Sequence, residues 1–212
     1  SLEEEFYMKK DASKPELHGG NIYRLAEKLG VDESEIIDFS ASINPLGVPK
    51  SVSAAIAANI SYLSNYPDPD TTQLRIHLSK HLGIPSSSMI CGNGSTELIY
   101  LIVKALRPEK VLIPAPTFSE YEKAVNSPEK IKYHLMWEKN GFRLDIDKFI
   151  NDMSGSSSPV TYKSALTTSV DIAFLCNPNN PTGKLLKKDD LMKISNTAKS
   201  LKCYIVVDEA FI

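Results

Sequence analysis

Strand-like and helix-like segments alternate along most of this chain, and this alternation restricts the fold more than any other feature. Apolar runs that match strands in length occupy residues 89–91, 110–113, 131–137, 172–176 and 204–207. Apolar residues recur at helical spacing in residues 21–29, 49–60, 71–82, 95–106, 118–125, 145–153 and 188–201. This order predicts an α/β fold, in which a mostly parallel sheet is flanked by helices in three αβα layers.

Composition and charge exclude several classes of partner. The formal net charge is -2, which gives no electrostatic basis for binding nucleic acid or an anionic membrane. No apolar stretch approaches the ~18 residues of a membrane span. Residues 1–17 are charged and have no signal-peptide core, so we expect a cytoplasmic protein.

Three cysteines, Cys91, Cys176 and Cys203, lie in strand-like runs. An odd number of cysteines in such positions indicates buried thiols in a reducing compartment. We therefore expect neither disulfides nor a metal site.

The sequence Cys-Asn-Pro-Asn-Asn-Pro-Thr-Gly at residues 176–183 follows a buried-type strand. Open α/β sheets bind ligands at the carboxyl ends of their strands. Asn180 carries an amide that can donate to a ligand oxygen, and the prolines near it restrict the backbone. The alternative is a proline-rich turn with no ligand.

The sequence Gly-Asn-Gly-Ser-Thr-Glu at residues 92–97 joins a predicted strand to a predicted helix. Helix N-termini present free N–H groups and a positive dipole end, which suit a phosphate. Gly94 allows close approach of the backbone, and Ser95 and Thr96 add hydroxyl donors. The same residues could equally form a simple helix cap.

Three further side chains have both a structural and a functional interpretation. Asp208 ends an apolar strand, where a carboxylate commonly caps the next helix. Phe118 follows the Pro-Ala-Pro-Thr sequence at residues 114–117 and could be a core residue. Tyr66 begins a Tyr-Pro-Asp-Pro-Asp turn before a predicted helix, where a tyrosine can simply lie on the surface.

Together with the Val-Val-Asp-Glu-Ala sequence at residues 206–210, these segments resemble the cofactor-binding signature of fold-type I pyridoxal-phosphate enzymes. The resemblance implies that Asp208 lies at the ring nitrogen and Asn180 at the 3′-oxygen, as the catalytic contacts. It implies that Gly94, Ser95 and Thr96 hold the cofactor phosphate and that Phe118 stacks on the ring. Tyr66 would reach a partner subunit's cofactor phosphate, which implies a homodimer.

Residues 18–21 (His-Gly-Gly-Asn) and 38–47 are similar to the start of threonine-phosphate decarboxylases, in which His18 and Asn44 would contact substrate. Phe211 stands where related aminotransferases commonly carry a tyrosine. The implied reaction is decarboxylation of L-threonine O-3-phosphate, a phosphorylated amino acid, to (R)-1-aminopropan-2-yl phosphate for cobalamin biosynthesis. The alternatives are a histidinol-phosphate or related aminotransferase and a catalytically silent dimerisation or regulatory module.

The resemblance also implies a division of the chain. Residues 1–45 would form an N-terminal arm and small-domain segment, and residues 46–212 an incomplete cofactor-binding large domain. The lysine that binds the cofactor covalently and the arginines that hold the substrate carboxylate would lie downstream of Asp208. We therefore expect a fragment that is inactive alone.

Overall fold

A computed structural model describes residues 19–155 and 169–211 of the chain. The chain divides into two compact units, Ser1–Pro69 and Asp70–Ile212. Each unit is described by itself.

Within residues 19–69, the first unit contains the helical elements α2 (Ile22–Leu29), η1 (Glu33–Glu35), α3 (Lys50–Ala58) and η2 (Ile60–Ser64). The side chain of Asn21 caps α2 by accepting a hydrogen bond from the backbone N–H of Arg24 at 3.1 Å. Helix α2 ends at Gly30, whose φ of 67° lies in the left-handed region that favours glycine. Both ends of this helix were predicted from the sequence.

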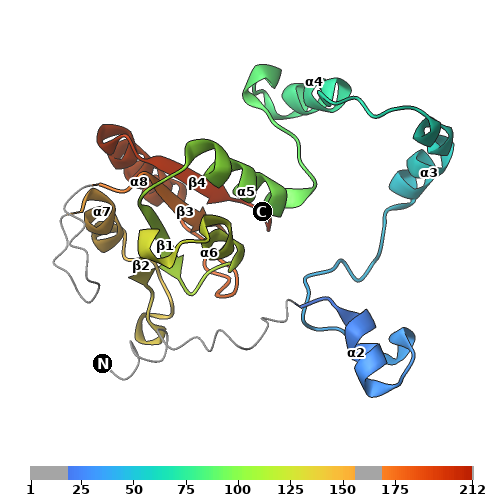
Figure 1. Cartoon of the computed structure of the whole chain (residues 1–212), viewed down its shortest axis with the longest axis horizontal. Coiled ribbons are helices and arrows are strands. Elements are labelled where there is room, and N and C mark those ends of the chain that lie inside the picture. The colour runs from blue at the N-terminus through green and yellow to red at the C-terminus, as the bar shows by residue number, and fades with distance from the viewer. Residues whose placement is uncertain (1–18, 156–168, 212) are drawn as a thin grey trace. The chain divides into compact units, whose positions relative to one another are not determined.

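The second unit is built on a four-stranded parallel sheet, shown in Figure 1. Its strands are β1 (Val111–Ala115), β2 (Ile131–Leu135), β3 (Ile172–Cys176) and β4 (Tyr204–Asp208). The strand order is β2-β1-β3-β4, and every neighbouring pair is parallel. The predicted parallel sheet is confirmed.

Helices precede and connect the strands. They are α4 (Thr72–Leu82), η3 (Ser86–Ser88), α5 (Gly94–Leu106), α6 (Glu120–Val125), η4 (Pro128–Lys130), η5 (Glu138–Asn140), α7 (Ile146–Ser154) and α8 (Lys188–Leu201). Helices α5, α6, α7 and α8 pack on the sheet. The five α-helices among these elements agree with predicted helices, whereas the short 3-10 helices η3, η4 and η5 were not predicted. In the part of the chain that the structure describes, no helix has both the length and the apolar character that crossing a bilayer requires.

Alternate residues of the central strands face two separate cores. Leu112, Ala173 and Leu175 face one core, where they meet side chains of α7 and α8 such as Phe149 and Ile194. Side chains on the other face of the sheet pack with Ile99 of α5 and Tyr121 of α6. They are Val111, Ile113, Ile172, Phe174 and Cys176. The sheet is therefore the middle of three layers, as predicted (Figure 1).

The predicted strand at residues 89–91 is wrong. These residues have no regular structure and follow η3 directly. A strand exists only where a neighbouring strand supplies hydrogen bonds, and the described sheet contains only β1 to β4. Cys91, predicted to be buried, is accordingly only half-buried, whereas Cys176 and Cys203 are buried and all three thiols are free.

The two compact units divide at Pro69–Asp70. The reason for this division is local packing, because α3 contacts η2 whereas α4 contacts η3. The domain boundary at residue 45 that the sequence suggested stays a prediction, as does the assignment of the first segment to a small domain. Residues 154–169 are polar and rich in serine, which predicts an exposed loop, and most of them (156–168) lie outside the described residues.

The predicted site residues of the second unit lie in segments that begin or end at one edge of the sheet. Parallel strands place all their carboxyl ends on the same edge, so the segments after β1, β3 and β4 begin there. Helix α5 connects to β1 through only residues 107–110 and packs on the sheet through Ile99. It therefore runs opposite to β1, and its N-terminus points toward the same edge.

Candidate active site

Asp208 ends β4 at the carboxyl edge and is half-buried. The hydroxyl of Tyr121 donates a hydrogen bond of 2.9 Å to Asp208 Oδ2. The backbone N–H of Ala210 donates one of 3.1 Å to Oδ1. Two donors from different parts of the chain therefore fix the plane of this carboxylate.

The ring of Tyr121 is held by two aromatic neighbours. It lies nearly parallel to Phe174 with ring centroids 4.8 Å apart, and it meets Phe118 edge-on at 5.7 Å. Tyr121 is completely buried. Burial raises the pKa of its hydroxyl far above the ordinary value, and Cys176 and Asp208 raise it further, so the group remains a proton donor.

The asparagines of residues 177–180 do different work. Asn177 Oδ1 accepts from the Leu186 backbone N–H at 2.7 Å. Asn179 is buried, and its Oδ1 accepts from the Thr117 hydroxyl at 2.7 Å. Its amide nitrogen donates to Pro116 O at 3.0 Å and to Thr182 Oγ1 at 2.9 Å. The bonds with Thr117 and Pro116 tie the segment after β3 to the segment after β1.

Asn180 differs from its neighbours. Its backbone N–H donates to Cys176 Sγ at 3.4 Å, whereas its half-buried side-chain amide has no hydrogen-bond partner among the described residues. Cys176 is the register partner of Asp208 across β3 and β4. Cys176 is therefore a common neighbour of Asn180 and Asp208, and the Asn180 amide is free to bind a ligand.

The N-terminus of α5 carries the predicted phosphate donors. Gly94 has a φ of 84°, which a side chain would strain, and the exposed Ser95 and Thr96 follow in the first turn. Their hydroxyls have no hydrogen-bond partner among the described residues. Glu97 accepts from the backbone N–H of Asn93 and from its side-chain amide, so its carboxylate satisfies a donor at the start of the helix.

Phe118 has the features of both interpretations that the sequence left open. It is half-buried and packs against the core that contains Tyr121, while part of the ring remains accessible. No hydrogen bond among the described residues links Ser95 or Thr96 to Asp208. Phe118 and Asp208 thus both contact Tyr121, the backbone of Asn180 contacts Cys176, and α5 points toward the same edge. That these residues form one cofactor site stays a prediction.

The remaining predicted residues belong to the first unit. Asn44 Oδ1 accepts from the backbone N–H of Leu46 at 3.0 Å, so this side chain shapes a turn. Tyr66 is 96% exposed. His18 lies outside the described residues.

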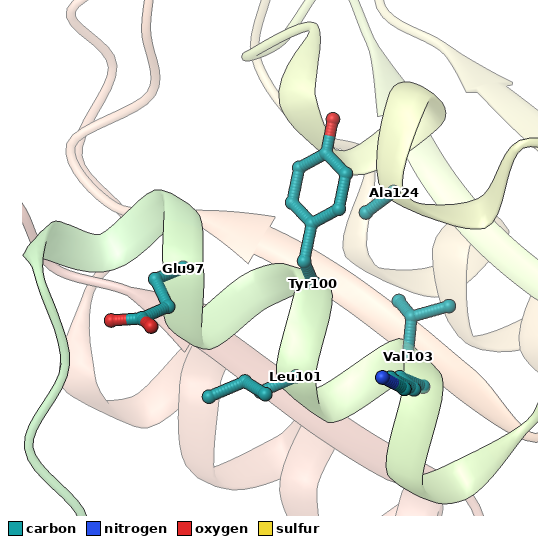
Figure 2. A pocket seen from close by; sticks show the side chains of 6 residues that line it. Glu97, Tyr100, Leu101, Val103 and Ala124 are labelled. Atoms are coloured by element: carbon teal, nitrogen blue, oxygen red, sulfur yellow. The ribbon is translucent and has the colours of Figure 1, made fainter.

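A pocket of about 350 Å³ lies elsewhere, between α5 and α6. Figure 2 shows Glu97, Tyr100, Leu101 and Val103 along α5, with Ala124 contributed by α6. None of the predicted site residues lines it. Within residues 19–155 and 169–211, no three His, Cys, Asp or Glu side chains are grouped closely enough to hold a metal ion.

Sequence reasoning missed Tyr121, Cys176 and Asn179. The contact of Tyr121 with Asp208 joins residues far apart in sequence, and no local pattern indicates it. Asn179 could have been noticed in the sequence, because it lies inside the motif that identified Asn180. Only the tertiary bonds to Thr117 and Pro116 separate the structural asparagine from the free one.

Comparison with known proteins shows the family of the chain. Residues 34–212 match the model of the family "Aminotransferase class I and II". The chain is 38% identical over 196 residues to the threonine-phosphate decarboxylase of Salmonella typhimurium, covering 92% of this chain and 50% of that protein. The chain thus spans about half the length of the curated relatives that it matches.

Two solved structures have the same fold. The histidinol-phosphate aminotransferase of Clostridium acetobutylicum matches with a TM-score of 0.69 and 29% identity, over 83% of this chain and 47% of that one. The L-threonine-O-3-phosphate decarboxylase of Porphyromonas gingivalis matches with a TM-score of 0.64 and 25% identity, over 84% and 47%. With its parallel sheet and the match over residues 34–212, the chain belongs to the class I and II aminotransferase family of fold-type I pyridoxal-phosphate enzymes.

Proposed function

We propose that the whole protein is a pyridoxal-phosphate-dependent threonine-phosphate decarboxylase of cobalamin biosynthesis, of which this chain supplies the N-terminal half. Its substrate is L-threonine O-3-phosphate, which loses its carboxylate as carbon dioxide, gains a proton at Cα and becomes (R)-1-aminopropan-2-yl phosphate. The observation that carries this proposal is the Asp208–Asn180 arrangement in a chain 38% identical to such a decarboxylase.

The side chains at the carboxyl edge fit pyridoxal phosphate in their chemistry. The ring nitrogen needs an anionic partner, and Asp208 offers a fixed carboxylate. The 3′-oxygen and the phosphate need donors, and the Asn180 amide and the hydroxyls of Ser95 and Thr96 have no partner among the described residues. An aromatic face at Phe118 completes the set.

Each residue then has a distinct task. When bound, pyridoxal phosphate supplies an electron sink for the charge that develops at the substrate α-carbon. Asp208 holds a proton at the ring nitrogen. Asn180 donates a hydrogen bond to the 3′-oxygen, and Gly94, Ser95 and Thr96 bind the phosphate with the α5 N-terminus. Phe118 covers the ring, and we propose that His18 and Asn44 orient the substrate.

The second candidate is a histidinol-phosphate aminotransferase. It is favoured by the similarity to the Clostridium acetobutylicum structure, whose TM-score of 0.69 exceeds that of the decarboxylase structure. The two reactions share the same cofactor contacts and differ in which bond to Cα breaks. The residues of this chain at the cofactor serve both.

An assay of products separates the candidates. The whole protein is incubated with pyridoxal phosphate and L-threonine O-3-phosphate without any 2-oxo acid, and carbon dioxide and 2-oxo acid products are measured. We expect carbon dioxide in stoichiometric yield and no 2-oxo acid. A reaction that needs histidinol phosphate and a 2-oxo acid acceptor would support the aminotransferase.

A silent dimerisation or regulatory module would show neither reaction. It would also fail to bind pyridoxal phosphate, which titration of the cofactor absorbance measures without turnover. Asn180→Ala serves as the control in both experiments, because it removes one predicted cofactor donor that no described residue uses.

A further inference from the structure

The bond between Tyr121 and Asp208 is the contact at this site that the cofactor assignment leaves unexplained. It joins α6 to the end of β4, and its 2.9 Å length is that of a good O–H···O hydrogen bond. We assign Tyr121 no direct contact with the cofactor. Its hydroxyl ends on the carboxylate that we assign to the ring nitrogen.

We propose that Tyr121 is a positioning residue that sets the orientation of the Asp208 carboxylate toward the ring nitrogen of pyridoxal phosphate. This inference rests on the proposed function. It adds that the position of the Asp208 carboxylate depends on α6 as well as on β4. Tyr121 acts only through Asp208.

The packing of the ring separates the role of the hydroxyl from that of the aromatic body. Phe174 lies against the face of the Tyr121 ring and Phe118 meets it edge-on, so apolar contacts hold the ring in place. The hydroxyl then stands at a fixed point relative to Asp208. Replacing Tyr121 by phenylalanine keeps these ring contacts and removes only the donor.

The surroundings keep Tyr121 a donor to Asp208. Burial, together with the neighbouring Cys176 and Asp208, holds the pKa of the phenol above its ordinary value, so the proton stays on the oxygen. Ala210 binds the other carboxylate oxygen from the main chain. Loss of Tyr121's hydroxyl therefore leaves Asp208 attached at one oxygen and free to rotate about it.

The chain offers a matched control in Tyr100. Its hydroxyl donates to the carboxylate of Glu120 at 3.1 Å. Figure 2 shows Tyr100 on α5. Tyr100→Phe thus removes a bond of the same chemical kind, between a tyrosine and a carboxylate that we do not assign to the cofactor. Any general effect of losing such a bond appears in both variants.

The test measures the dissociation constant of pyridoxal phosphate for the whole protein, with kcat and KM for L-threonine O-3-phosphate. Wild type, Tyr121→Phe, Tyr100→Phe, Asp208→Asn and the Tyr121→Phe/Asp208→Asn double variant are compared. We expect Tyr121→Phe to weaken cofactor binding on the order of tenfold and to lower kcat with little change in KM. Tyr100→Phe should stay within about twofold of wild type.

The double variant distinguishes positioning from general packing. If Tyr121 acts through Asp208, Tyr121→Phe has almost no further effect on cofactor affinity once Asp208 is asparagine. An equal loss in both backgrounds, or none in either, overturns the inference while leaving the proposed function intact. Failure of the wild-type protein to bind the cofactor overturns the proposed function itself, and this inference with it.

Discussion

At the scale of single residues, the neighbouring Asn179 and Asn180 have different roles: the first is structural, and we assign the second to the cofactor. Asn179 is buried, and its hydrogen bonds with Thr117 and Pro116 join the segments after β1 and β3. Asn180 keeps its side-chain amide free of partners among the described residues. The sequence motif identified Asn180 from its place in a known signature, but only the tertiary contacts distinguish the two roles.

This division predicts opposite effects of two adjacent substitutions. Asn179→Ala leaves the Thr117 hydroxyl and the Pro116 carbonyl without their partner, so we expect a loss of about 1–3 kcal/mol in the free energy of unfolding. Asn180→Ala should change stability by less than about 0.5 kcal/mol and should weaken binding of pyridoxal phosphate. Urea unfolding and cofactor titration of both variants measure this. Equal destabilisation by both substitutions would contradict the assignment.

At the scale of elements, apolar periodicity predicted the sheet and its helices because each element buries one face. Helix α8 appears at the predicted residues, 188–201, and β3 at 172–176. The strand at 89–91 failed because strand formation depends on a partner that local sequence does not specify. Tyr121 was missed for the same reason, since the stacked ring and the bonded carboxylate come from β3 and β4.

Burial of Cys203 immediately before β4 gives a prediction for pH dependence. Burial, helped by the charge of Asp171, raises the pKa of this thiol from 9.0 to about 12. The folded state therefore resists ionisation that the unfolded state allows. This contribution to stability is fully present below pH 9 and is lost as the pH rises toward 12.

Urea unfolding between pH 8 and pH 12 tests this expectation. The stability of the wild type should fall relative to that of Cys203→Ala as the pH rises. Cys91→Ala, which removes a half-buried thiol, is the matched control. A wild-type advantage over Cys203→Ala that stays constant with pH would show that ionisation of this thiol is not coupled to unfolding.

At the scale of the whole molecule, we propose a homodimer whose active sites include residues of both subunits. The first unit by itself exposes large apolar side chains, among them Phe39, Leu46 and Leu63. Exposed apolar residues in such number commonly mark an interface. The resemblance places Tyr66 at the cofactor phosphate of the partner subunit, and its exposure leaves it accessible for this contact.

The dimer predicts a measurable role for one hydroxyl. In the whole protein, Tyr66→Phe should weaken cofactor binding by about 1.5–3 kcal/mol, the value of a hydrogen bond to a charged group. The interface should bury more than ~1,000 Å². Analytical ultracentrifugation and cofactor titration measure the two effects. A fully active monomer at working concentration would rule out the shared site.

The central claim is that the carboxyl edge holds pyridoxal phosphate with Asp208 at the ring nitrogen and Asn180 at the 3′-oxygen. The most direct measurement is a crystal structure of the whole protein with the cofactor bound. We predict both contacts at hydrogen-bond distance, about 2.6–3.2 Å, with the Tyr121 hydroxyl still bonded to Asp208. A ring whose nitrogen points away from Asp208, or a cofactor bound in the α5–α6 pocket, would contradict the account.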